Sequence, residues 1–337
     1  MRILCFHLNQ VGDLAFSLPA LKCIRDTFPD ATVTSVVRPA AREVLESTHL
    51  ADEVVSREPG LNLDKCRLAR RLAAGKPDVA IVLSQSAECA MLSYISRAPK
   101  RIGFINTSFG RLLTHQVDFA HPPSTQNNLR LVESAGCEIT KKDYVGLLTP
   151  SDAQIERANR ILAEHSVAPG DPIAALAPGT SSRRSVKEWT DEGFAAVGSY
   201  LSDMGLKVVV LGTVPATNIV KESGQLIDVS GKTDLGEVAA IVARSKLLVA
   251  VDSGILHLAA AAGTTVVGLY GPSNPEITGP QGDGHIVVTS NAQCSPCIRT
   301  ECEHGRKCML DITPDDVIQA AEAILARPSP AVQARSS

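Results

Sequence analysis

The sequence has no apolar run of the roughly 18–20 residues that a membrane-spanning helix requires. Its longest apolar stretches, Leu247–Val251 and Thr265–Tyr270, have the length of β-strands. The N-terminus also lacks the pattern of a secretory signal, because its short apolar run soon meets Asn9, Gln10 and Asp13. These absences predict a cytoplasmic protein, whose membrane work, if any, takes place at the surface of the bilayer.

Positive charge is not in excess either. The chain of 337 residues has 33 Lys and Arg against 36 Asp and Glu, a formal net charge of −3. A protein that binds nucleic acid broadly needs a basic face, so we expect no nucleic-acid partner. No Walker motif and no Gly-x-Gly-x-x-Gly pattern is present. The length exceeds that of one ordinary core, which predicts two domains.

The chain contains a regular alternation of strand-like and helix-like segments. Predicted strands cover Ile3–Leu8, Thr32–Val37, Asp52–Val55, Asp78–Leu83, Arg101–Phe104, Ile173–Ala177, Lys207–Leu211, Leu247–Val251 and Thr265–Tyr270. Predicted helices cover Leu14–Phe28, Ala40–Ser47, Leu61–Ala74, Thr125–Ala135, Ser151–His165, Thr190–Met204, Leu235–Ala243, Ile255–Ala262 and Thr313–Ala326. This alternation is typical of parallel sheets with helices on both faces, and therefore of an α/β protein.

A Pro- and Gly-containing stretch, 167–172, separates two such series. We therefore predict a first domain over residues 1–168 and a second over 169–312, both Rossmann-like and doubly wound. A last helix over 313–327 and a disordered tail over 328–337 complete the chain. In such sheets ligands bind beyond the carboxyl ends of the strands, so the residues that follow the strands are the candidates for a site.

The first candidate follows the first strand, in the run Asn9-Gln10-Val11-Gly12-Asp13. Gly12 allows a tight turn or a close approach of the backbone to a ligand. Asp13 lies at the start of a helix, where it could simply cap that helix and favour its dipole. Alternatively, Asp13 is a general base directed into the cleft. The residues alone leave both interpretations open.

The second candidate follows Ile173–Ala177. Gly179, Thr180 and Ser181 offer a flexible backbone and hydroxyl groups, and Lys187 supplies a cation nearby. This composition suits a cradle for phosphate groups, although an ordinary polar loop would look the same.

The third candidate joins the strand Leu247–Val251 to a short Ala-rich helix. Asp252, Ser253 and Gly254 precede the helix, whose first N–H groups are able to bind a diphosphate. His257 follows within one turn, and it is either part of this site or a structural histidine.

Four cysteines near the C-terminus form the fourth candidate. Cys294, Cys297, Cys302 and Cys308 lie within the Cys-rich loop 294–308. Four thiols at this spacing could hold a structural zinc or iron ion with tetrahedral geometry. The alternative is a set of reduced cysteines in an irregular loop.

Taken in order, these motifs resemble glycosyltransferase family 9, the ADP-heptose:lipopolysaccharide heptosyltransferases. The resemblance extends over nearly the whole chain. It rests on Val11-Gly12-Asp13-Leu14, Leu18-Pro19-Ala20-Leu21, Arg101-Ile102-Gly103-Phe104, Pro178-Gly179-Thr180 with Lys187 and Trp189, Val229–Leu235, Asp252–His257 and Leu269–Ser273. The cysteine block that ends at Cys308-Met309 is also common in the family.

The resemblance implies a GT-B fold, in which two Rossmann-like domains face each other across a cleft. The N-terminal domain would take the acceptor and the C-terminal domain the nucleotide sugar, and the last helix could cross back to the first domain. The reaction would be inverting and need no catalytic metal. Asp13 would be the base, Asp252 would touch the sugar, and phosphate binding would fall to Thr180, Ser181, Lys187, Ser253, Gly254 and His257.

The function so implied is transfer of heptose from ADP-heptose to a lipopolysaccharide inner-core acceptor of lipid A with Kdo or heptose. The protein would work at the inner face of the cytoplasmic membrane. Alternatives within the family are another nucleotide sugar or a protein acceptor, as in relatives that glycosylate autotransporters. Outside it, two Rossmann-like domains also suit a nucleotide-sugar epimerase or a nucleotide-binding regulator.

The chain departs from the family pattern at two positions. Many members have an acidic residue, suited to a ribose contact, shortly after the strand at Lys207–Leu211. Here no carboxylate follows until Glu222, so the identity of the donor's nucleotide stays open. His7 stands where an Arg is usual, which suggests a different acceptor. Acceptor choice is expected in the loops Ser84–Met91 and Asn106–His115.

Overall fold

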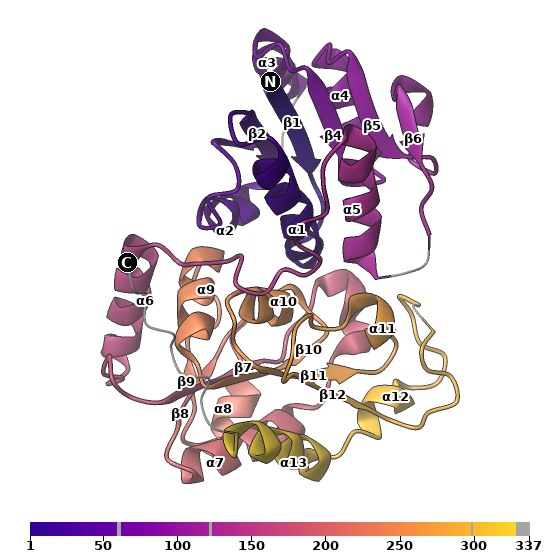
Figure 1. The fold of residues 1–337 in the computed structure, drawn as a ribbon. Helices are drawn as coiled ribbons and strands as arrows, with labels where there is room; N and C mark the ends of the chain where they lie inside the picture. The colour runs from indigo at the N-terminus through magenta and orange to yellow at the C-terminus, as the bar shows by residue number, and fades with distance from the viewer. Residues whose placement is uncertain (59–61, 121–122, 298, 328–337) are drawn as a thin grey trace.

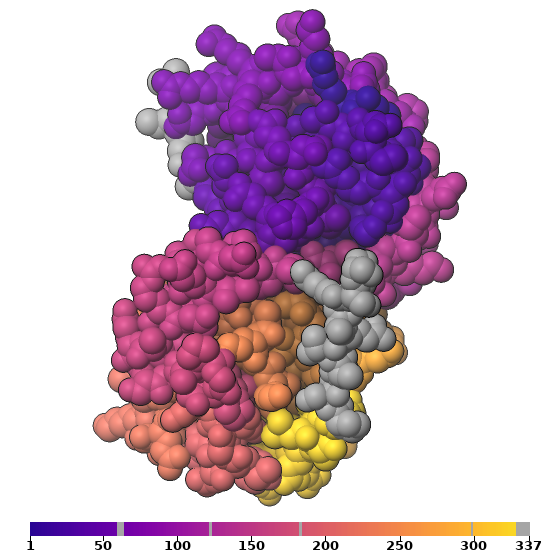
Figure 2. Space-filling model, turned by 60° about the vertical axis from the view of Figure 1, so that its left-hand side comes forward, coloured from indigo at the N-terminus to yellow at the C-terminus, as the bar shows by residue number. Residues whose placement is uncertain are grey.

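The computed structural model describes residues 1–58, 62–120, 123–297 and 299–327. The expected disordered tail, 328–337, lies outside the described residues. Two parallel six-stranded sheets, each flanked by helices on both faces, form two domains that Figure 2 shows as an upper and a lower lobe. The predicted α/β class and GT-B architecture are confirmed.

The first sheet has the strand order β3-β2-β1-β4-β5-β6. Its strands are β1 (Arg2–His7), β2 (Thr32–Val37), β3 (Glu53–Ser56), β4 (Val79–Val82), β5 (Lys100–Phe104) and β6 (His115–Val117). Its helices are α1 (Val11–Thr27), α2 (Arg42–Glu46), α3 (Asn62–Ala74), α4 (Ala87–Ile95) and α5 (Ser124–Ala135), with the 3-10 turns η1 (Pro39–Ala41) and η2 (Gly110–Leu112). The chain order reverses between β1 and β4.

The second sheet repeats this arrangement, with the order β12-β11-β10-β7-β8-β9. Its strands are β7 (Ile173–Ala177), β8 (Lys207–Val210), β9 (Ile227–Asp228), β10 (Leu247–Val251), β11 (Val266–Tyr270) and β12 (Ile286–Thr289). The other elements are α6 (Asp152–Glu164), η3 (Ser182–Lys187), α7 (Asp191–Asp203), α8 (Thr217–Ser223), α9 (Leu235–Arg244), α10 (Gly254–Ala261), α11 (Pro275–Thr278), α12 (Lys307–Leu310) and α13 (Pro314–Leu325). Here the order reverses between β7 and β10.

The central strands explain why these segments form parallel sheets. Every residue of β7, β10 and β11 is buried. A strand covered by helices on both sides has no solvent face, so its sequence is uniformly apolar rather than alternating. Several helices begin with a side-chain cap: Thr190, for example, accepts the N–H of Gly193 at the start of α7.

The two domains meet through α1 of the first and α10 of the second, which pack together (Figure 1). α6 forms a second bridge. On one side the Gln154 amide lies 2.7 Å from the hydroxyl of Ser47 beside α2. On the other, α6 packs against α9. Its residues Ala158 and Leu162 belong to the core beneath the second sheet, so the predicted boundary at 168/169 cuts off a helix that packs with the second domain.

Two further expectations are wrong. The last helix, α13, does not cross back to the first domain, because its buried residues Val317, Ala321 and Ile324 belong to the core of the second domain. Figure 1 shows α13 on the side of the second sheet away from the first domain. The predicted helix start at Leu14 is too late, because residues 11–13 already form the first turn of α1. Among the described residues, no helix combines the length and apolarity needed to cross a membrane.

Candidate active site

The candidate residues lie at the two points where strand order reverses. β1 is paired with β2 on one side and β4 on the other, and β7 with β8 and β10. The chain leaves β1, β7 and β10 toward the space between the domains, and these exits carry three of the four sequence motifs. Such reversal points are where open α/β sheets bind ligands.

The first turns of α1 and α10 approach each other closely. A Cβ atom added to Gly12 would lie 3.1 Å from Cδ2 of His257, and one added to Gly254 would lie 3.1 Å from Cβ of Val11. Only glycine allows this contact without displacement of a neighbour. Two helix N-termini, one from each domain, therefore lie together, and both favour negative charge.

Asp13 lies in the first turn of α1. Its carboxylate accepts the N–H of Gln10 at 3.3 Å, so it does help to cap the helix, as the simpler interpretation predicts. Its side chain remains in contact with solvent, yet protein atoms surround it, and this desolvation raises its pKa. Lys187 and His257, both on the second domain, act in the opposite direction. Asp13 thus lies within electrostatic reach of groups on the second domain.

Asp252 is the buried anion of the site. Lys187 Nζ lies 2.6 Å from its Oδ2 atom, and His257 Nε2 lies 3.7 Å from its Oδ1 atom. Burial alone would raise the pKa of Asp252, but His257 and Lys187 outweigh it and hold this pKa well below its usual range. Asp252 is therefore ionised, and the predicted residues Lys187, Asp252 and His257 form one connected group.

Ser253 occupies the N-cap position of α10 without capping it. Its Oγ atom is buried and has no hydrogen-bond partner among the residues that the structure describes. A buried hydroxyl without a partner carries a desolvation cost, which a bound acceptor such as a phosphate oxygen would remove. Thr180 is half-buried and Ser181 exposed, and both lie between β7 and η3, in the loop that carries Lys187 to Asp252.

Sequence reasoning missed three residues around His257. The Phe16 ring centroid lies 4.6 Å from that of His257, and the Tyr144 hydroxyl lies 3.0 Å from its Nδ1 atom. Gln281 donates its backbone N–H to the same hydroxyl. None of the three belongs to a motif, because Phe16 reads as helix core and Tyr144 lies between predicted elements.

His7 was expected to reflect the acceptor, and the structure corrects this. The side chain is buried, with Nδ1 2.8 Å from the hydroxyl of Ser17 and Nε2 3.5 Å from that of Ser35. Burial lowers the pKa of His7 to about 3. A neutral histidine inside the first domain cannot take over the contact of an exposed arginine with an acceptor.

The loop after β8 is contacted by a carboxylate from another strand. Asp228, at the end of β9, accepts the N–H of Ala216 and of Ser230, each at 2.9 Å. The parallel pairing of β8 with β9 brings Asp228 to this loop. Its role here is to hold the loop backbone.

The predicted metal site is not supported. Cys294, Cys297, Cys302 and Cys308 do line one small cavity of about 180 Å³. Burial, together with the other three thiols, raises the pKa of Cys308. Nevertheless, within the described ranges no group of three or more His, Cys, Asp or Glu side chains is arranged to hold a metal ion.

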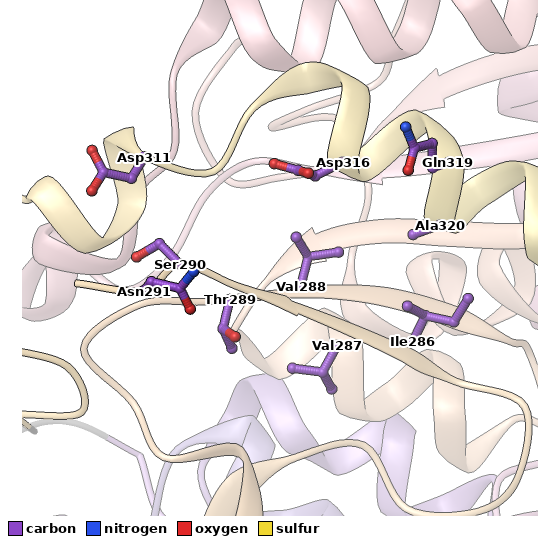
Figure 3. A pocket seen from close by; sticks show the side chains of 10 residues that line it. All are labelled: Ile286, Val287, Val288, Thr289, Ser290, Asn291, Asp311, Asp316, Gln319 and Ala320. Atoms are coloured by element: carbon purple, nitrogen blue, oxygen red, sulfur yellow. The ribbon is translucent and has the colours of Figure 1, made fainter. Parts of the chain in front are cut away.

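A larger hollow lies elsewhere, at the outer edge of the second sheet between β12 and α13 (Figure 3). Its volume is about 700 Å³, and Thr289, Asp316 and Gln319 are among the residues that line it. None of the residues singled out by the sequence motifs borders it. The site between the domains therefore remains the candidate.

Comparison with known proteins decides the family. Residues 65–307 match the model of glycosyltransferase family 9 (heptosyltransferase), which is most of the chain. The chain belongs to glycosyltransferase family 9. The resemblance read from the motifs is confirmed, and the protein is an enzyme that transfers a glycosyl group.

Relatives of this family 9 glycosyltransferase align over almost its whole length. Lipopolysaccharide heptosyltransferase 2 of Escherichia coli K12 is 23% identical, over 96% of this chain and 99% of that protein. A family 9 glycosyltransferase from Veillonella parvula has a TM-score of 0.82 at 25% identity, covering 96% and 97% of the two chains. E. coli heptosyltransferase WaaC, solved with ADP and with ADP-2-deoxy-2-fluoro heptose, has a TM-score of 0.74 at 19% identity, covering 96% of this chain and at least 99% of that one.

Proposed function

We propose that this glycosyltransferase moves a heptose from ADP-heptose to a lipopolysaccharide inner-core acceptor built on lipid A with Kdo or heptose. The observation that carries the proposal is the close approach of the first turn of α1, which includes Asp13, to the N-terminus of α10 on the second domain, where Lys187 pairs with Asp252. The names of full-length relatives, which are lipopolysaccharide heptosyltransferases, support the choice of sugar and acceptor.

The donor would bind to the second domain. The diphosphate would take the free N–H groups of α10, the hydroxyl of Ser253 and the charge of Lys187, with Thr180 and Ser181 alongside. Asp252 would contact the sugar. These groups stabilise negative charge on the departing ADP as its bond to the sugar breaks, so the reaction would need no metal ion. The E. coli heptosyltransferase solved with ADP supports the choice of nucleotide.

Asp13 would act as the general base. Its carboxylate would remove the proton from the acceptor hydroxyl while that oxygen attacks the anomeric carbon. Attack from the first domain, on the side opposite to the departing ADP, inverts the configuration at that carbon. The raised pKa of Asp13 makes it a stronger base than an ordinary aspartate, although it must still be ionised to act.

The proposed acceptor implies where in the cell the protein would act. A saccharide carried on lipid A stays at a membrane surface, so the protein would act from the cytoplasm at the inner face of that membrane. The first domain would hold the saccharide, with the acceptor hydroxyl next to the carboxylate of Asp13.

Asp13→Asn tests the proposal with purified protein, ADP-heptose and a Kdo-lipid A acceptor. Asparagine keeps the size and the oxygen that accepts the Gln10 N–H, but it cannot take a proton. We expect transfer to fall by about 10²–10⁴-fold. Binding of ADP, measured by calorimetry, should stay within about twofold of wild type. Unchanged turnover in Asp13→Asn would remove Asp13 from the mechanism.

A donor screen separates the alternatives. ADP-, GDP-, UDP- and dTDP-sugars are compared by calorimetry, and we expect ADP-heptose to bind most tightly. If another nucleotide sugar binds more tightly, the family assignment stands but the proposed donor is wrong. This outcome needs testing because the loop after β8 lacks the carboxylate that many family members have there. Transfer to protein in place of lipid A saccharide would replace the acceptor. Turnover of nucleotide sugar without any acceptor would indicate an epimerase.

A further inference from the structure

His257 is enclosed by side chains of both domains. It is carried by α10 and is buried, with Phe16 of α1 against one part of the ring. Tyr144, also fully buried, comes from the segment that connects α5 to α6. The two ring nitrogens of His257 therefore face different partners: Nδ1 faces the Tyr144 hydroxyl at 3.0 Å, and Nε2 faces Asp252 at 3.7 Å.

The hydrogen bonds of Tyr144 decide where the ring protons lie. Gln281 donates its backbone N–H to the Tyr144 oxygen at 3.1 Å. Burial raises the pKa of Tyr144, so the hydroxyl keeps its own proton. Among the described residues, Nδ1 of His257 is the acceptor placed to receive that proton. If Nδ1 carried a proton itself, the buried hydroxyl proton would be left without a partner, which is costly.

The surroundings of Nε2 favour the same positions of the ring protons. Asp252 is an ionised carboxylate and can only accept hydrogen bonds. A proton on Nε2 points at this carboxylate and is attracted to it, whereas a lone pair there would be repelled. At 3.7 Å the contact is longer than an ordinary hydrogen bond, so its effect is electrostatic. Both sides of the ring therefore favour a proton on Nε2 and none on Nδ1.

We propose that Tyr144 is a positioning residue, whose hydroxyl holds His257 in the Nε2–H tautomer that directs its N–H at Asp252. Two buried groups that no sequence motif contains, Tyr144 and the Gln281 backbone, thereby fix the orientation of a motif residue. Gln281 also bonds to Thr125 of α5, which ties this arrangement to the first domain. The link to catalysis rests on the proposed function of Asp252 toward the donor sugar.

The tautomer can be measured directly, without any activity. The full-length protein is labelled with 15N-histidine, and the side-chain nitrogens are observed by NMR at neutral pH. His257→Gln identifies the His257 signals by their loss. In wild type we expect a protonated Nε2 and an unprotonated Nδ1. In Tyr144→Phe, which removes only the hydroxyl, we expect the Nδ1–H or doubly protonated form to appear.

Tyr270→Phe is the matched control. It removes the hydroxyl of another buried tyrosine, at the end of β11 in the second domain, which donates to the carbonyl of Thr278 rather than to a histidine. A general loosening of the core would affect both variants alike. The proposal requires that only Tyr144→Phe changes the nitrogen signals of His257. A protonated Nδ1 in wild type, or unchanged His257 signals in Tyr144→Phe, would overturn it.

Kinetics then test whether the tautomer matters for transfer. In Tyr144→Phe the Nε2–H of His257 would no longer be held toward the charged Asp252. We expect the loss of this oriented donor to lower kcat/KM for ADP-heptose about tenfold. Tyr270→Phe should stay close to wild type. A changed tautomer with unchanged kcat/KM would refute the catalytic part. If wild type itself transfers no heptose, the proposed function fails while the NMR result on Tyr144 still stands.

Discussion

Nζ of Lys187 lies 2.6 Å from Oδ2 of Asp252, and this contact joins the loop after β7 to the loop after β10. Both side chains are largely shielded, with 18% and 6% of their surfaces exposed. Lys187, which we propose contacts the donor's phosphates, is therefore already paired with a carboxylate in the free protein. Under the proposed function the donor would share Lys187 with Asp252, so we expect the pair to affect both stability and binding.

The first prediction concerns this pair. Lys187→Met leaves a buried carboxylate without its cation, so we expect the free energy of unfolding to fall by about 2 kcal/mol. This is less than for a fully buried pair, because Lys187 is partly exposed. Urea denaturation at neutral pH measures the change. ADP affinity, measured by calorimetry, should fall about tenfold with the loss of a charged hydrogen bond.

The double variant Lys187→Met/Asp252→Asn is the control for that prediction. It removes both charges, so most of the lost stability should return while ADP binding stays weak. A double variant as unstable as Lys187→Met alone would show that packing, and not the unpaired charge, accounts for the loss.

The second prediction is that Asp13 lowers stability while it serves the reaction. Asp13 is exposed to solvent, but the protein atoms around its carboxylate desolvate it and raise its pKa in the folded state, so the folded protein binds a proton more readily than the unfolded chain. Stability therefore decreases as pH rises from the ordinary aspartate pKa through the raised one. Asparagine does not ionise, so Asp13→Asn should not lose stability in this way and should be more stable than wild type at neutral pH. The advantage should disappear in acid, where Asp13 is protonated in both states.

Urea unfolding at several pH values measures that difference, and the activity profile provides an independent check. If Asp13 is the general base, as we propose, it must be ionised to act, and kcat/KM in wild type should decline with falling pH around a pKa above that of an ordinary aspartate. An Asp13→Asn variant less stable than wild type at neutral pH would contradict the prediction, and would assign Asp13 mainly to the helix cap with Gln10.

Much of the fold is predictable from sequence because the central strands are buried on both sides. Leu247–Val251 is an uninterrupted apolar run, and in the structure it is β10, in the middle of the second sheet. The edge strands β6 and β12 bury little, so their sequences carry no comparable signal. α4 is also missed, since exposed apolar residues such as Met91 and Tyr94 blur its helical periodicity, and part of the expected loop Ser84–Met91 is in fact helix.

The site is predictable only where it follows a strand. Lys187 and Asp252 lie in such segments and form an ion pair in the structure, and Asp13, after β1, lies within electrostatic reach of both. Tyr144 cannot be found this way, because its importance arises from a contact with His257, 113 positions along the chain. His7 shows the opposite error: its place in the sequence suggests a ligand contact, whereas its burial beside Ser17 shows a core residue.

The third prediction compares two glycines of the site. A Cβ on Gly12 would lie 3.1 Å from His257, whereas a Cβ on Gly179 would meet no atom within 4 Å. Gly12→Ala should therefore lower the free energy of unfolding by about 1–3 kcal/mol, as overpacking does. Gly179→Ala should leave stability unchanged. If Gly179 lets the backbone approach a phosphate, its alanine variant should still weaken ADP binding, measured by calorimetry. Equal stability of the two variants would contradict the close approach of α1 and α10.

The last prediction uses the hydroxyl of Ser253, which is buried and finds no partner in the described parts of the chain. Replacing it with alanine removes a desolvated polar group that bonds to nothing, so Ser253→Ala should be as stable as wild type or slightly more stable. The same change should weaken ADP binding about fivefold, because the hydroxyl gains its partner only from the ligand. Thermal unfolding with and without ADP measures both effects: the melting temperature of the free variant should be unchanged, and the increase caused by ADP should shrink. Thr313→Ala, which removes a hydroxyl that does cap its helix, should instead lower the melting temperature and leave the ADP effect intact. A Ser253→Ala variant that loses stability but responds fully to ADP would show that this hydroxyl supports the fold and not the ligand.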